Sequence, residues 1–185
     1  MKYEVLTYGR KELKRKATPV ETFDEDLSAL ARDMLRTMYA AVGVGLAANQ
    51  IGRPENLCVI DVPPDQDTDT ETRQRMNPDV VMPLIMANPR IESMSGERVC
   101  REGCLSFPDV NVMIRRANEI VCSYRGLDGK PRTVRAVDLL ARAIQHEADH
   151  LNGILLVDRM STVQRLSLAG RLRRLKTEAE AAVPA

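Results

Sequence analysis

The stretch DLLARAIQHEADHLNG, residues 138–153, decides how this 185-residue chain folds. Apolar side chains recur in it at helical spacing and make a broad apolar face, which predicts a helix packed against a core. Gly153 stands where such a helix can end. The same stretch carries both histidines of the chain, so its fold and its chemistry are linked. The apolar positions are Leu139, Leu140, Ala143 and Ile144.

The two histidines, His146 and His150, are four residues apart. On an α-helix this spacing places them about one turn apart on one face, where both can bind one ion. Glu147 flanks that face, and a carboxylate there can take a proton from a metal-bound water, as in the H-E-x-x-H helix of zinc hydrolases. The alternative is a solvated helix face, because a five-residue pattern also arises by chance.

A catalytic site of this kind needs a third protein ligand. The extended motif H-E-x-x-H-x-x-G-x-x-H is excluded, because Leu156 stands where its last histidine belongs. Glu178 and Glu180 are poor candidates, since they lie near the end of a predicted surface helix. A thiolate suits a divalent ion of borderline softness. Cys104 is the best placed, because REGCLSFPDV breaks a strand pattern and can expose both a side chain and peptide N–H groups.

The other three cysteines have different interpretations. Cys58 and Cys122 fall inside apolar strands, where cysteine is usually a small core residue. Cys100 precedes Cys104 with C-x3-C spacing, and both thiolates with two histidines could close a structural zinc site that has no place for water. The amino terminus has no apolar run long enough for a secretory signal, so disulfides are not expected.

Charge and hydropathy limit the binding partners and the cellular location that we expect for this protein. With 27 basic and 26 acidic residues the chain is nearly neutral, so we expect no direct sequence-specific binding to nucleic acid. No segment is long and apolar enough to span a membrane, so no membrane partner is expected. A cytoplasmic protein is predicted.

Strand patterns dominate the middle of the chain. LCVID at 57–61 is a short apolar run typical of a buried strand, and residues 84–137 contain several strand-like runs. Asp128-Gly129 marks a hairpin turn between two of them. ILLVD at 154–158 is a further predicted strand.

Helices are predicted at both ends. Residues 22–42 form the first, with Thr22 and Glu25 as a capping box and Gly43 as its stop. Residues 161–182 form a basic C-terminal helix with leucines, including Leu166 and Leu168, at helical spacing. Its charge could contact ribosomal RNA, although a solvated amphipathic helix is the simpler interpretation.

Together these elements predict a single α+β metallohydrolase domain over residues 1–185. Mostly antiparallel strands pack around the central helix that carries H-E-x-x-H, with one helix before them and one after. Residues 62–83 combine four prolines with acidic and polar residues, which favours a loop inserted between strands. A solvated insertion and a mobile flap are both open for this segment.

The glycine-rich GVGLAANQIG, residues 43–52, lacks the Lys-Ser/Thr of a phosphate-binding P-loop and the spacing of the dinucleotide fingerprint. Gly43 and Gly45 would let the backbone approach a ligand closely, and Gln50 offers an uncharged amide donor. A tight connection from helix to strand is the simpler alternative.

Three motifs in fixed order carry a resemblance: GVGLAANQ at 43–50, EGCLSFP at 102–108 and QHEADHLNG at 145–153. They resemble the signature motifs of the peptide deformylases, and the similarity spans about residues 1–160. That family removes the formyl group from the initiator methionine of nascent polypeptides. Phe107 stands where the family commonly has a smaller aliphatic residue, and Arg142 where many members have an apolar one, which puts the pocket's preference beyond methionine in doubt.

The resemblance implies a role for each motif. Cys104, His146 and His150 would bind a divalent ion, which is Fe2+ in many members and Zn2+ in others; the ligand set also admits Ni2+ and Co2+. Glu147 would be the general acid/base for a metal-bound hydroxide that releases formate. The amide of Gln50 and the backbone N–H of Leu105 would hold the oxyanion.

A methionine substrate needs an unbranched apolar pocket beside the ion. Val44, Gly45, Leu139 and Ala143 are candidates for its walls, although the apolar three could equally be ordinary core. Two other functions remain open beside N-formylmethionyl peptide hydrolysis. One is a zinc peptidase of another kind, and the other is a metal-stapled interaction protein in which Cys100 is a ligand.

Overall fold

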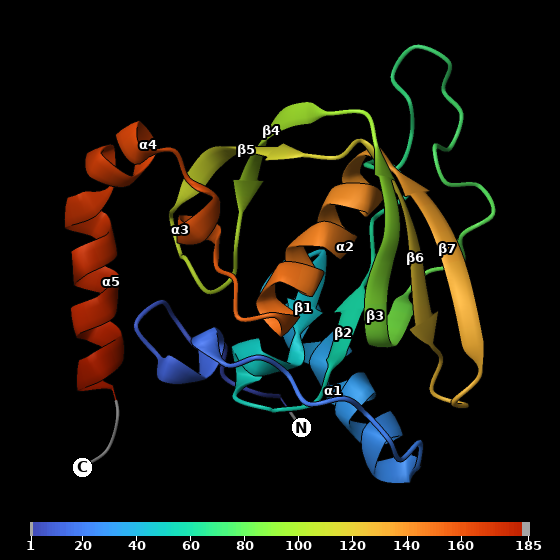
Figure 1. Ribbon diagram of the computed structural model, residues 1–185, viewed down its shortest axis with the longest axis horizontal. Coiled ribbons are helices and arrows are strands. Elements are labelled where there is room, and N and C mark those ends of the chain that lie inside the picture. Colours follow the sequence, from blue (N-terminus) through green and yellow to red (C-terminus); the bar gives the residue numbers. More distant parts are fainter. Residues whose placement is uncertain (1, 183–185) are drawn as a thin grey trace.

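The computed structural model describes residues 2–182. Two antiparallel sheets enclose one central helix, α2 (Asp138–Leu151) (Figure 1). The larger sheet has the order β1-β2-β3-β6-β7, and β4 and β5 form a separate hairpin. The strands are β1 (Gly45–Ala47), β2 (Leu57–Ile60), β3 (Leu84–Ser95), β4 (Arg98–Gly103), β5 (Asn111–Arg116), β6 (Glu119–Arg125) and β7 (Pro131–Val137).

Helix α2 is buried on most of its faces, and not only on its apolar one. Its apolar side packs on β1, β2, β3, β6 and β7 of the larger sheet, where Leu140 and Ile144 join a core that includes Ile60 and Met86. The predicted α+β arrangement around this helix is confirmed. The helix ends as predicted before Gly153, which adopts a left-handed φ of 73°.

Helix α1 (Glu25–Ala40) packs on β1 and β2 and fills a second core. The predicted capping residues were wrong: Asp24 is the N-cap, and its carboxylate accepts from the Leu27 N–H at 3.0 Å. The predicted stop was also displaced, because Val42 takes the left-handed conformation (φ 56°) just before Gly43.

Most of the predicted strands are confirmed, including β2 within 57–61 and the hairpin turn at Gly129 (φ 71°). The glycine-rich segment is more than a connection. Its residues form the short edge strand β1 and a 3-10 helix, η2 (Ala48–Ile51), which places Gln50 under the site. The other 3-10 helix is η1 (Lys11–Lys14).

The end of the chain differs from its prediction. The expected strand at 154–158 was wrong, because a short helix, α3 (Leu156–Arg159), forms there and the Asp158 carboxylate accepts from the Leu155 N–H at 2.9 Å. In place of one helix at 161–182 there are two, α4 (Thr162–Ser167) and α5 (Ala169–Ala181), separated at Leu168. As a result Leu166 is 71% exposed, while Leu172 and Leu175 pack in a third core.

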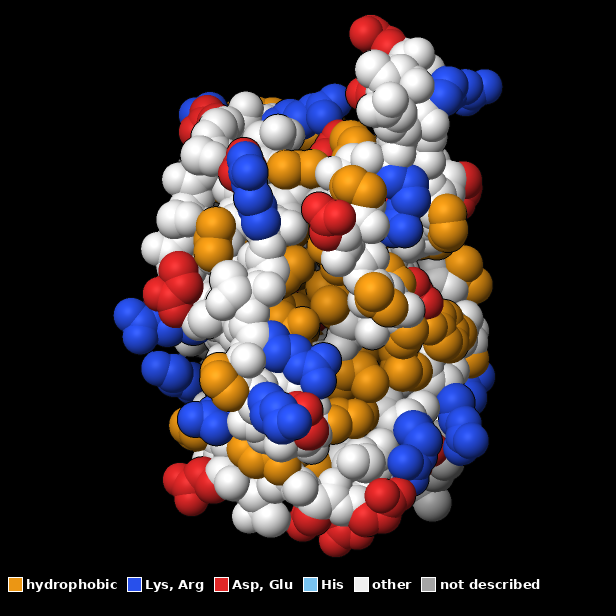
Figure 2. Space-filling view, turned by 90° about the vertical axis from the view of Figure 1, so that its right-hand side faces the viewer, with side chains coloured by type: hydrophobic (Ala, Val, Ile, Leu, Met, Phe, Trp, Pro, Cys, Tyr) orange, Lys and Arg blue, Asp and Glu red, His pale blue; other side chains and the backbone are white. Residues whose placement is uncertain are grey.

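Residues 62–83 form an irregular loop that projects beyond the sheet (Figure 1). Asp67 anchors it: the carboxylate is buried and accepts from Arg75 at 3.0 Å and from the Asn77 amide at 2.5 Å. Asn77 also bonds both backbone groups of Val137, the residue just before α2. In the space-filling view the loop stands above a face on which hydrophobic side chains gather (Figure 2). Within residues 2–182, no helix is long and apolar enough to cross a membrane.

Candidate active site

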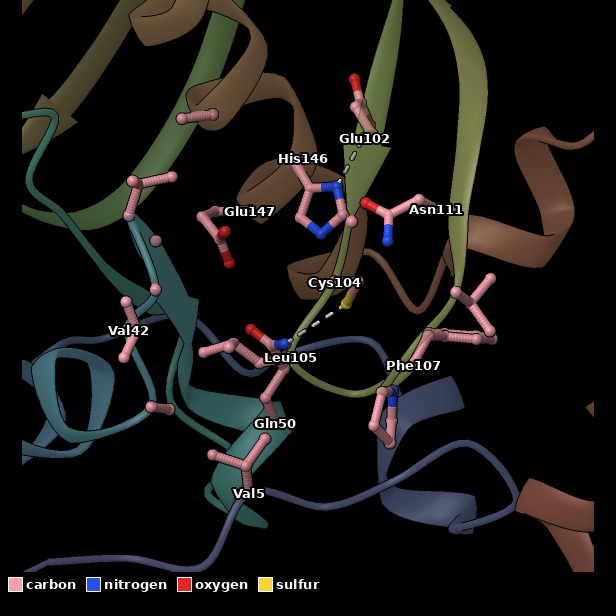
Figure 3. Close-up of a pocket in the computed structure, with 18 of the residues that line it drawn as sticks. Val5, Val42, Gln50, Glu102, Cys104, Leu105, Phe107, Asn111, His146 and Glu147 are labelled. Carbon is pink, nitrogen blue, oxygen red and sulfur yellow. Dashed lines mark hydrogen bonds and ion pairs between the residues drawn. The ribbon is translucent and has the colours of Figure 1, made fainter. Parts of the chain in front are cut away.

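Three side chains with metal-ligand chemistry meet at the core of the site: Cys104, His146 and His150. Cys104 and His146 are labelled in Figure 3. Their ligand atoms all lie within 4.8 Å of one another, and Cys104 Sγ is 3.1 Å from His150 Nε2. The histidines come from α2, and Cys104 follows the end of β4. Cys100 is not in this cluster, so the four-ligand site considered above does not form among the described residues.

The residues present fit a divalent ion. A thiolate and two imidazoles form a borderline-soft donor set that suits Zn2+ and Fe2+. Burial, helped by the charges of His146 and Arg116, holds the pKa of His150 well below its usual value, so its imidazole is neutral and able to bind a metal. Its Nδ1 atom is buried without a partner among residues 2–182, which leaves Nε2 as the nitrogen that faces Cys104.

Glu147 lies in the same cavity, beside His146 (Figure 3). It is 3% exposed, and its Oε2 atom has no hydrogen-bond partner among the described residues. Burial raises its pKa to about 7, although His146 and Arg116 oppose the shift. A carboxyl group with this pKa can both accept and return a proton near neutral pH.

Gln50 directs its amide nitrogen toward Cys104. The Ala47 N–H donates to Gln50 Oε1 at 2.8 Å, which fixes the orientation of the amide. Nε2 then lies 3.2 Å from Ser106 Oγ and 3.7 Å from Cys104 Sγ. The backbone N–H of Leu105, the residue after Cys104, makes no hydrogen bond within residues 2–182 and is a free donor.

A buried chain of charges supports the site, and the sequence did not reveal it. Glu102 Oε2 is 3.3 Å from His146 Nδ1, and Arg116 bridges Glu102 and Asp149 at 3.0 and 2.5 Å. Arg159 completes the chain on Asp149. Such a carboxylate fixes the orientation of a ligand histidine. Glu102 and Asp149 lie inside two of the quoted motifs, but nothing near Arg116 signalled its role.

The charge chain also shifts the pKa values around His146. Burial alone would raise the pKa of Glu102, but hydrogen bonds from His146 and Arg116 outweigh it and lower the pKa to about 2. Burial alone would lower the pKa of His146, and Cys104, Glu102 and Glu147 together raise it well above its usual value. Glu102 therefore stays ionised and can hold the Nδ1 proton of His146 in place.

A cavity of about 620 Å³ opens in front of these groups. All four predicted wall residues line it, together with Arg142 and with residues that the sequence did not single out, such as Val5 and Asn111. Phe107 also borders the cavity but is mainly a core residue, 1% exposed and stacked on Tyr8 with 4.8 Å between ring centroids. The predicted wall residues are Val44, Gly45, Leu139 and Ala143.

An H-E-x-x-H helix, a cysteine near both histidines and a buried glutamate in an apolar-walled cavity define a metal-dependent hydrolase. Residues 2–166 match the family model described as polypeptide deformylase. The peptide deformylase of Opitutus terrae is 40% identical over 179 residues, which cover 95% of this chain and 93% of that protein.

Two further comparisons agree. The peptide deformylase of Rhizobium meliloti is 45% identical over 154 residues, which cover 83% of this chain and 82% of that protein. A crystal structure of a peptide deformylase from Legionella pneumophila matches with a TM-score of 0.81 and 37% identity over 100% of both chains. The chain belongs to the peptide deformylase family.

Proposed function

We propose that this protein removes the N-formyl group from the initiator methionine of nascent polypeptides in the cytoplasm and releases formate. The observation that carries the proposal is a single cavity lined by Cys104, His146 and Glu147. Glu147 Oε2 has no partner among the described residues, and the ligand atoms of Cys104 and His146 cluster with that of His150. Membership of the peptide deformylase family supports the same reaction.

We assign Cys104, His146 and His150 as the ligands of the divalent ion. Three protein ligands leave a further coordination position for water or substrate. Fe2+ is the proposed ion, in line with the family resemblance, and the same donors accept Zn2+, Ni2+ or Co2+. When bound, the ion polarises the formyl carbonyl and lowers the pKa of a water from 15.7 to roughly 7.

The protein's own groups then move the proton and hold the charge. Glu147 accepts a proton from the attacking water, whose oxygen forms a bond to the formyl carbon. Gln50 Nε2 and the Leu105 N–H donate to the oxygen that becomes negative, and one such donor contributes roughly 3 kcal/mol. When the carbon–nitrogen bond breaks, Glu147 returns the proton to the leaving amine.

Val44, Gly45, Leu139 and Ala143 are proposed to hold the methionine side chain. They line the cavity beside Glu147, and Leu139 and Ala143 lie on the same helix as the histidines. Their apolar surface suits an unbranched thioether chain.

Replacing Gly45 with alanine is expected to reduce kcat by about 100-fold, because a small displacement of a catalytic group has an effect of this size. A Cβ atom at this position would collide with the carboxylate of Glu147. Gly170→Ala is the matched control, since a Cβ there meets nothing within 4 Å, and its kcat should be unchanged. Steady-state formate release from both variants tests this. Equal rates in Gly45→Ala and the unaltered protein would contradict it.

The assay of the function itself combines two measurements on anaerobically purified protein. Metal analysis is expected to find about one divalent ion per chain, and formyl-Met-Ala-Ser is expected to yield formate and the free peptide. If the metal-loaded protein releases no formate, the proposal is wrong. If it cleaves internal peptide bonds instead, a peptidase of another kind is the better assignment.

Contact with the ribosome is a further part of the proposal. Arg165 and Arg171 already have partners within the chain, the Val157 carbonyl and the exposed Asp109. The exposed basic residues left on α5 are Arg173, Arg174 and Lys176, opposite the buried Leu172 and Leu175. Phosphate contacts by such residues are salt-sensitive, so co-sedimentation with ribosomes that is independent of salt concentration would count against this contact.

A further inference from the structure

Three charged side chains form a cluster between β4 and the start of α2. Asp138 Oδ1 accepts from Arg142 Nη2 at 3.1 Å, and Asp138 Oδ2 accepts from Arg98 Nη1 at 2.8 Å. One carboxylate therefore serves two guanidinium groups, and the cluster keeps a net positive charge. We call these residues the Asp138 cluster.

The backbone of Asp138 is held in an unfavourable conformation. Its φ of 48° is left-handed, which is disfavoured for a residue with a Cβ atom. The side chain is only 18% exposed and is bonded from both sides, so the surrounding contacts hold the residue in this conformation. The hydrogen bond to Asp138 therefore orients the side chain of Arg142, which lies on the helix that carries the histidines.

Arg142 borders the cavity of the proposed active site, one helical turn before His146. Its side chain is 17% exposed, Nε is buried without a partner, and Nη1 makes no hydrogen bond within residues 2–182. Asp138 thus satisfies only one of the nitrogens of this guanidinium. Nε is buried, so Nη1 is the donor that remains for an acceptor that enters the cavity.

Apart from Glu147, which is assigned above as the proton carrier, the other charged side chains along the cavity are paired or more exposed. Glu102 is paired with Arg116, and Asp109 with Arg171. Arg101 has no ion pair among the described residues, but its side chain is exposed, and solvent and salt screen such a charge. The half-buried guanidinium of Arg142 is screened less than Arg101, so of these two unbalanced basic groups Arg142 acts more strongly on a peptide bound in the cavity.

We infer that Arg142 makes the enzyme favour formylated chains in which an acidic residue directly follows methionine. The inference rests on the proposed deformylase function and adds a substrate preference to it. Leu139 and Ala143 are the neighbours of Arg142 on α2, so a methionine side chain against them brings the next residue to the guanidinium. A carboxylate there accepts a charge-assisted hydrogen bond from Arg142, while an ammonium group is repelled.

The test compares three peptides, formyl-Met-Glu-Ser, formyl-Met-Gln-Ser and formyl-Met-Lys-Ser, in the metal-loaded enzyme. At low salt we expect kcat/KM to be about threefold higher for the Glu peptide than for the Gln peptide, mainly through KM, as for a partly exposed ion pair. The ratio should fall toward one at high salt. Equal kcat/KM for all three peptides at low salt would overturn the inference, and absence of formate from all three would instead overturn the proposed function.

Two variants locate the preference. Arg142→Gln should bring the Glu/Gln ratio to about one, whereas Arg90→Gln, a change of the same charge on an exposed part of β3, should keep it. Asp138→Asn removes the negative charge of the Asp138 cluster and should raise the ratio above that of the unaltered enzyme. A ratio that survives in Arg142→Gln, or that falls in Asp138→Asn, refutes the assignment. Unfolding temperatures of all variants check that each is folded.

Discussion

Replacing Glu147 with glutamine is expected to lower kcat by about 100-fold to 10,000-fold while the protein keeps its divalent ion. Glutamine has nearly the same shape but can neither accept nor return the proton. Because Glu147 is 3% exposed and its Oε2 has no partner among the described residues, no hydrogen bond of that atom holds the fold together. The loss should therefore appear in kcat, with metal content and unfolding temperature unchanged.

The measurement pairs formate release with metal analysis of the same preparation. Glu71→Gln, an exposed change in the loop at 62–83, is the control and should behave like the unaltered enzyme. If Glu147→Gln retained more than a tenth of the activity, Glu147 would not be the proton carrier. If it lost its ion, Glu147 would have to be counted among the ligands.

Replacing Cys104 with serine is expected to weaken metal binding by at least about 100-fold and to abolish activity. Loss of a partner outside the ligand shell already costs roughly 10-fold to 100-fold in affinity, and Cys104 is assigned as a ligand itself. A serine hydroxyl stays protonated at neutral pH and does not replace a thiolate. Dialysis against a chelator, followed by metal analysis, measures the difference.

Cys100→Ser is the matched control for this experiment. Cys100 lies four residues earlier, on β4, and is not part of the ligand cluster. This variant should keep its ion and its activity. Loss of the ion from Cys100→Ser would instead support the closed site in which Cys100 is a fourth ligand, and would make the role of the metal structural. Retention of the ion by Cys104→Ser would remove Cys104 from the ligand set.

Local patterns were enough for much of this fold. The period of α2 and the spacing of its histidines depend only on neighbouring residues, so both follow from the sequence. Helix α3 could not be found in this way: it has four residues, too few for a period, and its buried Leu156 and Val157 resemble a strand. The break at Leu168 likewise has no proline to signal it, and Gly170 lies within α5 rather than at the break.

The residues of the site also differ in whether the sequence alone could predict them. Gln50, Cys104 and Glu147 were identifiable because each lies in a motif of contiguous residues. The contact of Arg116 with Glu102 and Asp149 joins residues 14 and 33 positions apart, and only tertiary structure reveals it. The same applies to Arg98, whose pairing with Asp138 spans 40 positions.

The charge chain of the buried Glu102, Arg116 and Asp149, which ends at the exposed Arg159, has a consequence for how this protein can evolve. Loss of one partner of a buried pair costs about 3–5 kcal/mol, a large part of the stability of a domain this size. A mutation at Glu102, Arg116 or Asp149 therefore leaves a charge that a second mutation has to remove before the first is tolerated. Glu102 and Asp149 each lie in one of the signature motifs, and Arg116 lies in neither. In homologous sequences we therefore expect substitutions at these three positions to occur together or not at all.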